Sequence, residues 1–130
     1  MTISKIRELL SAELICGEGD LSDEVYTACG SDMMSDVLAY VKDQAVLLTG
    51  LVNTQVVRTA EMMDMICIVF VRNKRPSEHM IALARDHNIV LMSTPKRMYE
   101  ACGILYSEGL NKNSRPLAGS DPDKNGESHA

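Results

Sequence analysis

Three short apolar segments dominate the second half of the chain, and they recur at a fixed interval. AVLLTG, CIVFVR and IVLMST begin at residues 45, 67 and 89, so each starts 22 residues after the one before it. A continuous apolar run of this length is typical of a strand buried on both faces, as in a parallel sheet covered by helices. We therefore expect three parallel strands at these positions.

Each run is followed by a helical pattern with its own start signal. The expected start signals are Asn53 or Thr54, Pro76 with Ser77, and Thr94 with Pro95. Strand–helix repeats in succession imply right-handed crossovers. The predicted fold class is α/β, a single three-layer domain with a mostly parallel sheet built from consecutive βα units. An all-α fold is the alternative, but the β-branched residues of these runs disfavour it.

The first 44 residues carry shorter patterns of the same two kinds. Thr2 is placed to cap a helix whose apolar face is formed by Ile3, Ile6, Leu9 and Leu10. Residues 13–16 and 25–29 are short strand candidates. A second helix is expected to begin at Ser31 or Asp32, with three inward-facing residues, Val37, Leu38 and Val41.

The last twenty residues, NKNSRPLAGSDPDKNGESHA, are polar almost throughout. Because they contain too few apolar residues to offset the entropy of ordering, we predict a disordered polar tail over 111–130. The folded part is then one domain over 1–110, which is an ordinary domain size.

The net charge of −5 argues against a general nucleic-acid-binding protein, which needs a surplus of Lys and Arg. The charge is also uneven. Residues 1–64 hold 4 basic and 11 acidic residues, whereas residues 65–110 hold 6 basic and 4 acidic ones. We therefore expect any anion site in the second half of the chain.

The longest apolar run, over 65–71, is far shorter than the roughly 20 residues of a membrane helix, and charges interrupt the N-terminal segment where a signal peptide would be apolar. These features predict a cytoplasmic protein without a membrane partner. The four cysteines form no CxxC pair and the three histidines no HxxxH pair. Buried thiols and surface histidines are expected, with no metal site and no cofactor. The acidic residues Asp20, Asp23 and Glu24 form either a cation-attracting cluster or a solvated loop.

Sequence signatures of catalysis are absent: the chain has no GxxxxGK[ST], GxGxxG or GxSxG motif. We expect no catalytic residues. Ligands of open parallel sheets bind at the carboxyl ends of the strands, where helix N-termini add N–H donors. The loops after the three apolar runs should share that edge, and their polar, basic and glycine residues suit a phosphate or another small anion. The candidate ligand-binding residues are Thr49, Gly50, Asn53, Arg72, Lys74, Ser93, Thr94 and Lys96. The alternative is that they are ordinary helix caps, turn residues and solvated cations.

The segments GSDMMSDVLAYV, AVLLTGLVNTQVVRTAEMMDMICIVFVRNKRP and IALARDHNIVLMSTPKRMYEACGILYSEGL together resemble the DRTGG domain family, over roughly residues 1–110. Members of that family occur alone, between CBS domains in regulatory pyrophosphatases, and in some phosphotransacetylases, and the domain is similar to the N-terminal domain of HPr kinase. The resemblance implies a small α/β domain that dimerises, lacks catalytic activity and acts in regulation. Stand-alone members from anaerobes accompany redox or hydrogenase genes, which implies a redox or metabolic enzyme as partner.

Two loops depart from the signature that names the family. The sequence reads TGLVN over 49–53, where Asp-Arg is expected, and VRNK over 71–74, where Thr-Gly-Gly is expected. Thr49, Gly50 and the Ser93–Thr94 turn still look family-like.

The sequence thus favours a non-catalytic regulatory or sensing module. It is expected to form a homodimer that recognises a partner protein or a small anionic, nucleotide- or phosphate-like ligand. One alternative is a structural or assembly subunit of a redox or hydrogenase system. The other, less favoured, is a small enzyme of phosphoryl or acyl transfer.

Overall fold

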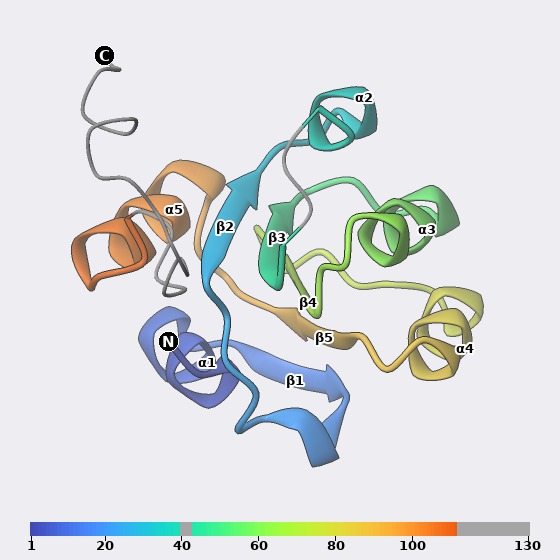
Figure 1. Cartoon of the computed structure of the whole chain (residues 1–130), viewed down its shortest axis with the longest axis horizontal. Helices are drawn as coiled ribbons and strands as arrows, with labels where there is room; N and C mark the ends of the chain where they lie inside the picture. Colours follow the sequence, from blue (N-terminus) through green and yellow to red (C-terminus); the bar gives the residue numbers. More distant parts are fainter. Residues whose placement is uncertain (40–42, 112–130) are drawn as a thin grey trace, which may run out of the picture.

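The computed structural model describes residues 1–39 and 43–111, which form a five-stranded sheet between two layers of helices (Figure 1). The elements, in chain order, are α1 (Ile3–Leu10), β1 (Glu13–Cys16), the 3₁₀ turn η1 (Glu18–Asp20), β2 (Thr27–Gly30), α2 (Met34–Val37), β3 (Ala45–Thr49), α3 (Thr54–Met62), β4 (Cys67–Phe70), α4 (Glu78–Asp86), β5 (Val90–Ser93) and α5 (Met98–Ser107). The three strands expected from the 22-residue interval are β3, β4 and β5.

The strand order is β1-β5-β4-β3-β2, and β2 to β5 are parallel. Only β1, at one edge, runs antiparallel to its neighbour β5. The predicted α/β class with a mostly parallel sheet is therefore confirmed. In register, Thr49 lies opposite Phe70, and Phe70 lies opposite Ser93. This alignment brings the carboxyl ends of β3, β4 and β5 to the same edge of the sheet.

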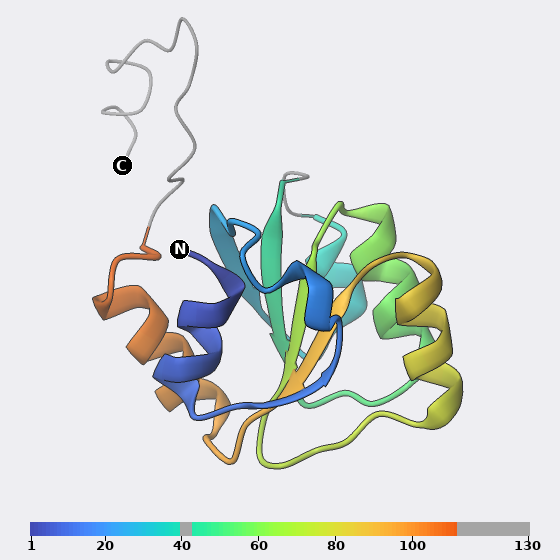
Figure 2. The ribbon, with the colours of Figure 1, turned by 90° about the horizontal axis from the view of Figure 1, so that it is seen from below.

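Side chains of the central strands alternate between two apolar layers, which is why their sequences read as continuous apolar runs. Val46 and Leu48 of β3 pack in the layer covered by α1 and α5. Ala45 and Leu47 pack in the layer covered by α2, α3 and α4. Figures 1 and 2 show these helices on opposite sides of the sheet. The three-layer arrangement gives a domain of this size two buried apolar interfaces.

Two details of the helices differ from the sequence-based expectation. The short helix α2 begins only at Met34, and Leu38, expected to face inward, is 45% exposed. Val41 and most of the predicted tail (112–130) lie outside the described residues. The last helix begins at Met98 with Arg97 as its N-cap, so Thr94 and Pro95 precede it by several residues. The prediction of a Thr94–Pro95 start is wrong because Thr94 forms hydrogen bonds that hold the preceding loop instead.

Among the residues that the structure describes, no helix is long and apolar enough to cross a bilayer. Cys16, Cys29 and Cys67 are buried, as expected, and Cys102 is partly exposed. Burial raises the pKa of the thiols of Cys16, Cys67 and Cys102 above its ordinary value, because a thiolate is poorly solvated there. These thiols are therefore poor nucleophiles in the folded state.

Candidate functional site

The loops after β4 and β5 are joined by backbone hydrogen bonds at the carboxyl edge of the sheet. The N–H of Arg72 donates to the carbonyl of Lys96 at 2.9 Å, and the N–H of Asn73 donates to that of Thr94 at 2.8 Å. The two loops therefore hold Arg72, Lys96 and Arg97 close to the start of α5. This confirms that the candidate loops share one edge of the sheet.

Asp32, in the loop after β2, organises the neighbouring loop after β3. Its Oδ1 accepts a hydrogen bond of 2.6 Å from the N–H of Gly50 and one of 3.1 Å from the hydroxyl of Thr49. The Thr49 oxygen in turn accepts from the N–H of Leu51 at 3.1 Å. The donors at Thr49 and Gly50 are thus already occupied by a carboxylate of the chain itself.

From the sequence, Asp32 is expected only as a helix start, and this role is not predicted. An acidic residue that closely follows a strand was the available signal, because all parallel strands end at the same edge.

Arg72 and Asn73 occupy a backbone conformation that favours glycine. Their φ angles are +56° and +58°, and the N–H of Lys74 donates to the carbonyl of Val71 at 3.1 Å. Two consecutive positive φ angles in such a turn define type I′, for which glycine is strongly preferred at the second central position and asparagine, aspartate or glycine at the first. Arginine in the left-handed region costs roughly 1–2 kcal/mol. The turn, over 71–74, forms in this chain without a glycine.

The Arg72 guanidinium extends over Gly50. A Cβ placed on Gly50 would lie 2.6 Å from Arg72 Nη2 and 3.5 Å from Asp32 Oδ1. Glycine at this position therefore leaves the space that the guanidinium uses. Arg72 and Asp32, with opposite charges, flank the same point of the backbone.

The polar residues after β5 have a structural role. The Ser93 hydroxyl donates to the carbonyl of Lys74 at 2.7 Å, and the Thr94 hydroxyl donates to that of Leu10 at 2.7 Å. Both side chains are buried, and Thr94 also accepts from the N–H of Lys96 at 3.2 Å. They fix the position of the loop, and their hydroxyl protons are used within the fold.

Two further residues of the edge have partners. The candidate Asn53 caps α3, since its Oδ1 accepts from the N–H of Val56 at 3.3 Å. Arg75 forms a double hydrogen bond with Glu13 of β1, at 2.9 and 3.1 Å. Their hydrogen bonds and opposite charges lower the pKa of Glu13 and raise the pKa of Arg75. Asn53 Oδ1 and the Arg75 guanidinium are therefore engaged within the fold, whereas the cap leaves the NH₂ group of Asn53 unused.

The remaining cations are less constrained. Lys96 lies 3.6 Å from Glu100, whereas Arg72, Lys74 and Arg97 form no ion pair within 1–39 and 43–111. The N-cap of α5, Arg97, provides no side-chain hydrogen bond to the first turn of the helix. The first N–H groups of α5 have no partner within the helix and carry partial positive charge. The edge therefore carries several cations, and one of them, Arg72, extends over Gly50 beside the Asp32 carboxylate.

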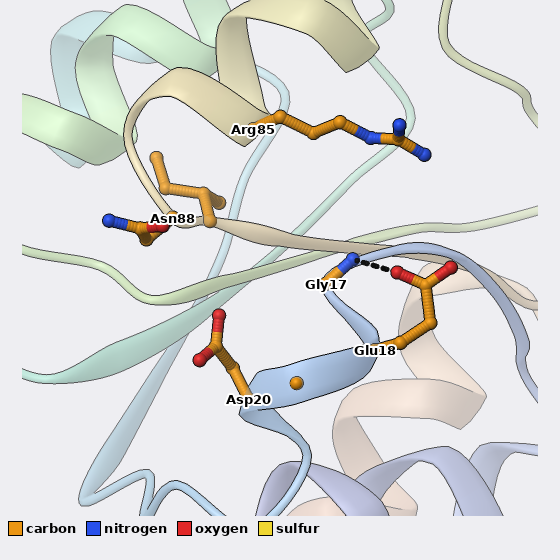
Figure 3. Close-up of a pocket in the computed structure, with 7 residues that line it drawn as sticks. Gly17, Glu18, Asp20, Arg85 and Asn88 are labelled. Atoms are coloured by element: carbon orange, nitrogen blue, oxygen red, sulfur yellow. Dashed lines mark hydrogen bonds between the residues drawn. The ribbon is translucent and has the colours of Figure 1, made fainter.

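A separate hollow lies at the opposite edge of the sheet, between η1 and the end of α4 (Figure 3). Its volume is about 310 Å³, and it is lined by Gly17, Glu18, Gly19, Asp20, Arg85, Asn88 and Ile89. Glu18 accepts a hydrogen bond from the N–H of Gly17. Within the described residues, no group of three or more His, Cys, Asp or Glu side chains is arranged to hold a metal ion. Of the acidic cluster considered above, Glu24 pairs with the N-terminal amine at 3.0 Å.

Comparison with known proteins identifies a solved structure with a similar fold and a family whose model matches the sequence. The chain is similar in structure to the CBS and DRTGG domains of the regulatory region of a Clostridium perfringens pyrophosphatase, crystallised with its activator diadenosine tetraphosphate. The TM-score is 0.68 at 14% sequence identity, and the match covers 98% of this chain and 60% of that one. The chain therefore spans less than two-thirds of that relative. No curated protein matches the sequence. The model of the DRTGG domain matches residues 5–107, and the chain therefore belongs to the DRTGG domain family.

Proposed function

We propose that this protein is a regulatory domain without catalytic activity that binds a small phosphate-bearing ligand at the carboxyl edge of its sheet. The observation that carries the proposal is the presence of four cations in the two hydrogen-bonded loops that precede α5, a helix without a side-chain cap: Arg72, Lys74, Lys96 and Arg97. Cations at a helix N-terminus are unfavourable by about 0.3–1 kcal/mol each when no anion is present. With a phosphate bound between them, the cations and the helix N-terminus would both be stabilised by its negative charge.

The backbone of the Arg72–Asn73 turn supports the same proposal. Positive φ angles at non-glycine residues are kept where surrounding structure enforces them, and they concentrate at ligand-binding sites. Here the enforcing structure is the pair of hydrogen bonds from the turn to Lys96 and Thr94. The strained turn presents an arginine where a glycine would be more stable.

The pyrophosphatase relative gives the proposal its ligand class. Its DRTGG domain belongs to a regulatory region that was crystallised with a nucleotide activator. We extend to this chain only the general role of sensing a nucleotide- or phosphate-like molecule. We further propose that it acts as a homodimer, as the family resemblance implies, and transmits the state of its ligand to a partner protein in the cytoplasm, the compartment that the sequence predicts.

The geometry does not favour the enzymatic alternative. The Thr49 hydroxyl is hydrogen-bonded to the Asp32 carboxylate, which superficially resembles a nucleophile beside a base. Thr49 is fully buried, however, so its oxygen has no access to a substrate. The hydroxyls of Ser93 and Thr94 donate to backbone carbonyls.

Thermal unfolding of the full chain with tripolyphosphate, ADP and inorganic phosphate tests the proposal. A ligand at 100 times its Kd adds about 2.7 kcal/mol, which raises Tm by several degrees in a domain of this size. We expect such a shift for the wild type and for Arg58→Ala, a control on the exposed side of α3, but not for Arg72→Ala. A shift that Arg72→Ala retains, or no shift with any of the three compounds, contradicts the proposed function.

A further inference from the structure

Two opposite charges lie near each other at the carboxyl edge without a direct ion pair. Arg72 Nη2 and Asp32 Oδ1 both border the position of the absent Gly50 Cβ, at 2.6 and 3.5 Å. No ion pair joins these two side chains, and Arg72 has no other acidic partner in the part of the chain that the structure describes. Both side chains are exposed. The edge therefore offers a free cation and a free carboxylate to the same incoming molecule.

The two oxygens of Asp32 are not equivalent. Oδ1 accepts from the N–H of Gly50 and from the hydroxyl of Thr49, which fixes the carboxylate in place. Oδ2 accepts no hydrogen bond from the residues over 1–39 and 43–111. A carboxylate oxygen is an acceptor only, so its natural ligand is an O–H or N–H donor.

Asp32 also disfavours the binding of an anion at Thr49 and Gly50. The Thr49 and Gly50 donors, which a phosphate would otherwise use, are already satisfied by Oδ1. A phosphate placed there would lie against a like charge. An anion is therefore expected to contact the Arg72 guanidinium and the start of α5 rather than the donors of Thr49 and Gly50.

We infer that the ligand is a phosphate ester that carries neighbouring hydroxyls, such as a ribonucleotide or a sugar phosphate. In this arrangement Asp32 Oδ2 accepts from a hydroxyl, while Arg72 and the start of α5 bind the phosphate. Asp32 is then the residue that distinguishes such an ester from inorganic phosphate or polyphosphate. This inference rests on the proposed function, because it needs phosphate binding at the same edge.

Calorimetric titration separates the two claims. The ligands are ATP, 2′,3′-dideoxy-ATP, ribose 5-phosphate, 2-deoxyribose 5-phosphate and tripolyphosphate, without divalent cations, so that no metal bridges the carboxylate and a phosphate. The test variant is Asp32→Asn, whose amide oxygen can still accept from Gly50 and Thr49 but whose NH₂ group replaces the free acceptor. The matched control is Asp36→Asn, which makes the same change of charge on an exposed residue of α2.

For the wild type and Asp36→Asn, we expect ATP to bind about tenfold or more tightly than its dideoxy analogue, as a hydrogen bond to a charged group predicts. If the ligand is a sugar phosphate, ribose 5-phosphate shows this preference over its deoxy analogue instead. Asp32→Asn should abolish the preference and leave tripolyphosphate binding unchanged or tighter.

Equal affinity of the wild type for the members of both pairs overturns the inference, even when tripolyphosphate binds. A preference that survives in Asp32→Asn also overturns it. If none of the compounds binds the wild type, the proposed function itself fails. The ligand pairs also test the unmodified protein, so the result does not depend on the folding of a variant.

Discussion

The hydroxyl residues after β3 and after β5 occupy equivalent places in the sheet but have different partners. Thr49 ends β3 and donates to the side chain of Asp32, an exposed residue of a neighbouring loop. Ser93 ends β5, and it and Thr94 donate to backbone carbonyls of Lys74 and Leu10. The first contact holds an exposed charged group, whereas the other two join separate segments of the backbone.

This difference shows that the position of a residue at the carboxyl edge does not decide its role. A hydroxyl that satisfies a buried carbonyl has no spare donor for a ligand. A hydroxyl that holds a carboxylate leaves the second carboxylate oxygen available. The β2–β3 side therefore contributes a recognition group, and the β5 side contributes the scaffold beneath the Arg72 turn.

Replacement of Thr94 or Thr49 by valine should destabilise the fold to different extents, because only the Thr94 hydroxyl bonds a buried backbone carbonyl. Thr94→Val leaves the carbonyl of Leu10 without a partner, and we expect a loss of about 1–3 kcal/mol. Thr49→Val leaves an exposed carboxylate that water can solvate, so we expect a smaller loss, of about 1 kcal/mol. Each variant also removes one acceptor of a backbone N–H, that of Leu51 for Thr49 and that of Lys96 for Thr94, so this cost is shared. Chemical denaturation of the two variants measures both values. Equal losses of stability in the two variants would show that the Thr49 and Thr94 hydroxyls have the same structural role.

Arg72→Gly should stabilise the domain while it removes the anion site. Glycine avoids the left-handed strain of roughly 1–2 kcal/mol but adds unfolded-state entropy, so we expect a net gain of about 0.5–1 kcal/mol. Asp64→Gly, at φ +58° near the opposite edge, is the control for binding and should leave tripolyphosphate affinity unchanged. A destabilised Arg72→Gly protein would mean that the guanidinium stabilises the fold more than the turn strains it.

Gly50→Ala should weaken the binding of tripolyphosphate while it leaves the free energy of unfolding almost unchanged. The new methyl group meets the far end of a flexible arginine at 2.6 Å, so the guanidinium can move away at little cost. We expect the free energy of unfolding to change by less than about 0.5 kcal/mol and tripolyphosphate affinity to fall a few-fold. Denaturation and titration of the same sample measure the two effects. Unchanged affinity would show that the position of Arg72 over Gly50 does not matter for binding.

The smallest effect concerns the Glu13–Arg75 pair. Because Arg75 lowers the pKa of Glu13 below its ordinary 4.5, the pair stabilises the folded state above that pH. The contribution is lost as pH falls through the lowered pKa. Tm of the wild type should exceed that of Glu13→Gln slightly near neutral pH, and the difference should vanish in acid. A constant difference across this range would exclude the ion pair as its source.

The sequence predicted the fold well because its main signal is periodic. Three apolar runs at a 22-residue interval required three buried parallel strands, and β3, β4 and β5 confirm them. The start of α5 was predicted wrongly because Thr94 and Pro95 form a common helix-start pattern. The distant carbonyl of Leu10, which binds Thr94 instead, is not visible in local sequence.

The candidate site was predicted only in its location. Arg72 and Gly50 lie together at the expected edge, whereas Ser93 and Thr94 have internal partners. The role of Asp32 depends on the pairing of β2 with β3, which places residues 18 positions apart in hydrogen-bond contact. A neighbour across strands cannot be read from spacing along the chain.

Chemical-shift mapping of the backbone amides with tripolyphosphate tests the central claim most directly. We expect the largest chemical-shift changes at the carboxyl edge and the start of α5, on the amides of Gly50, Arg72, Asn73, Arg97 and Met98. Changes confined to Gly17, Asn88 and their neighbours, around the hollow at the opposite edge, would contradict it.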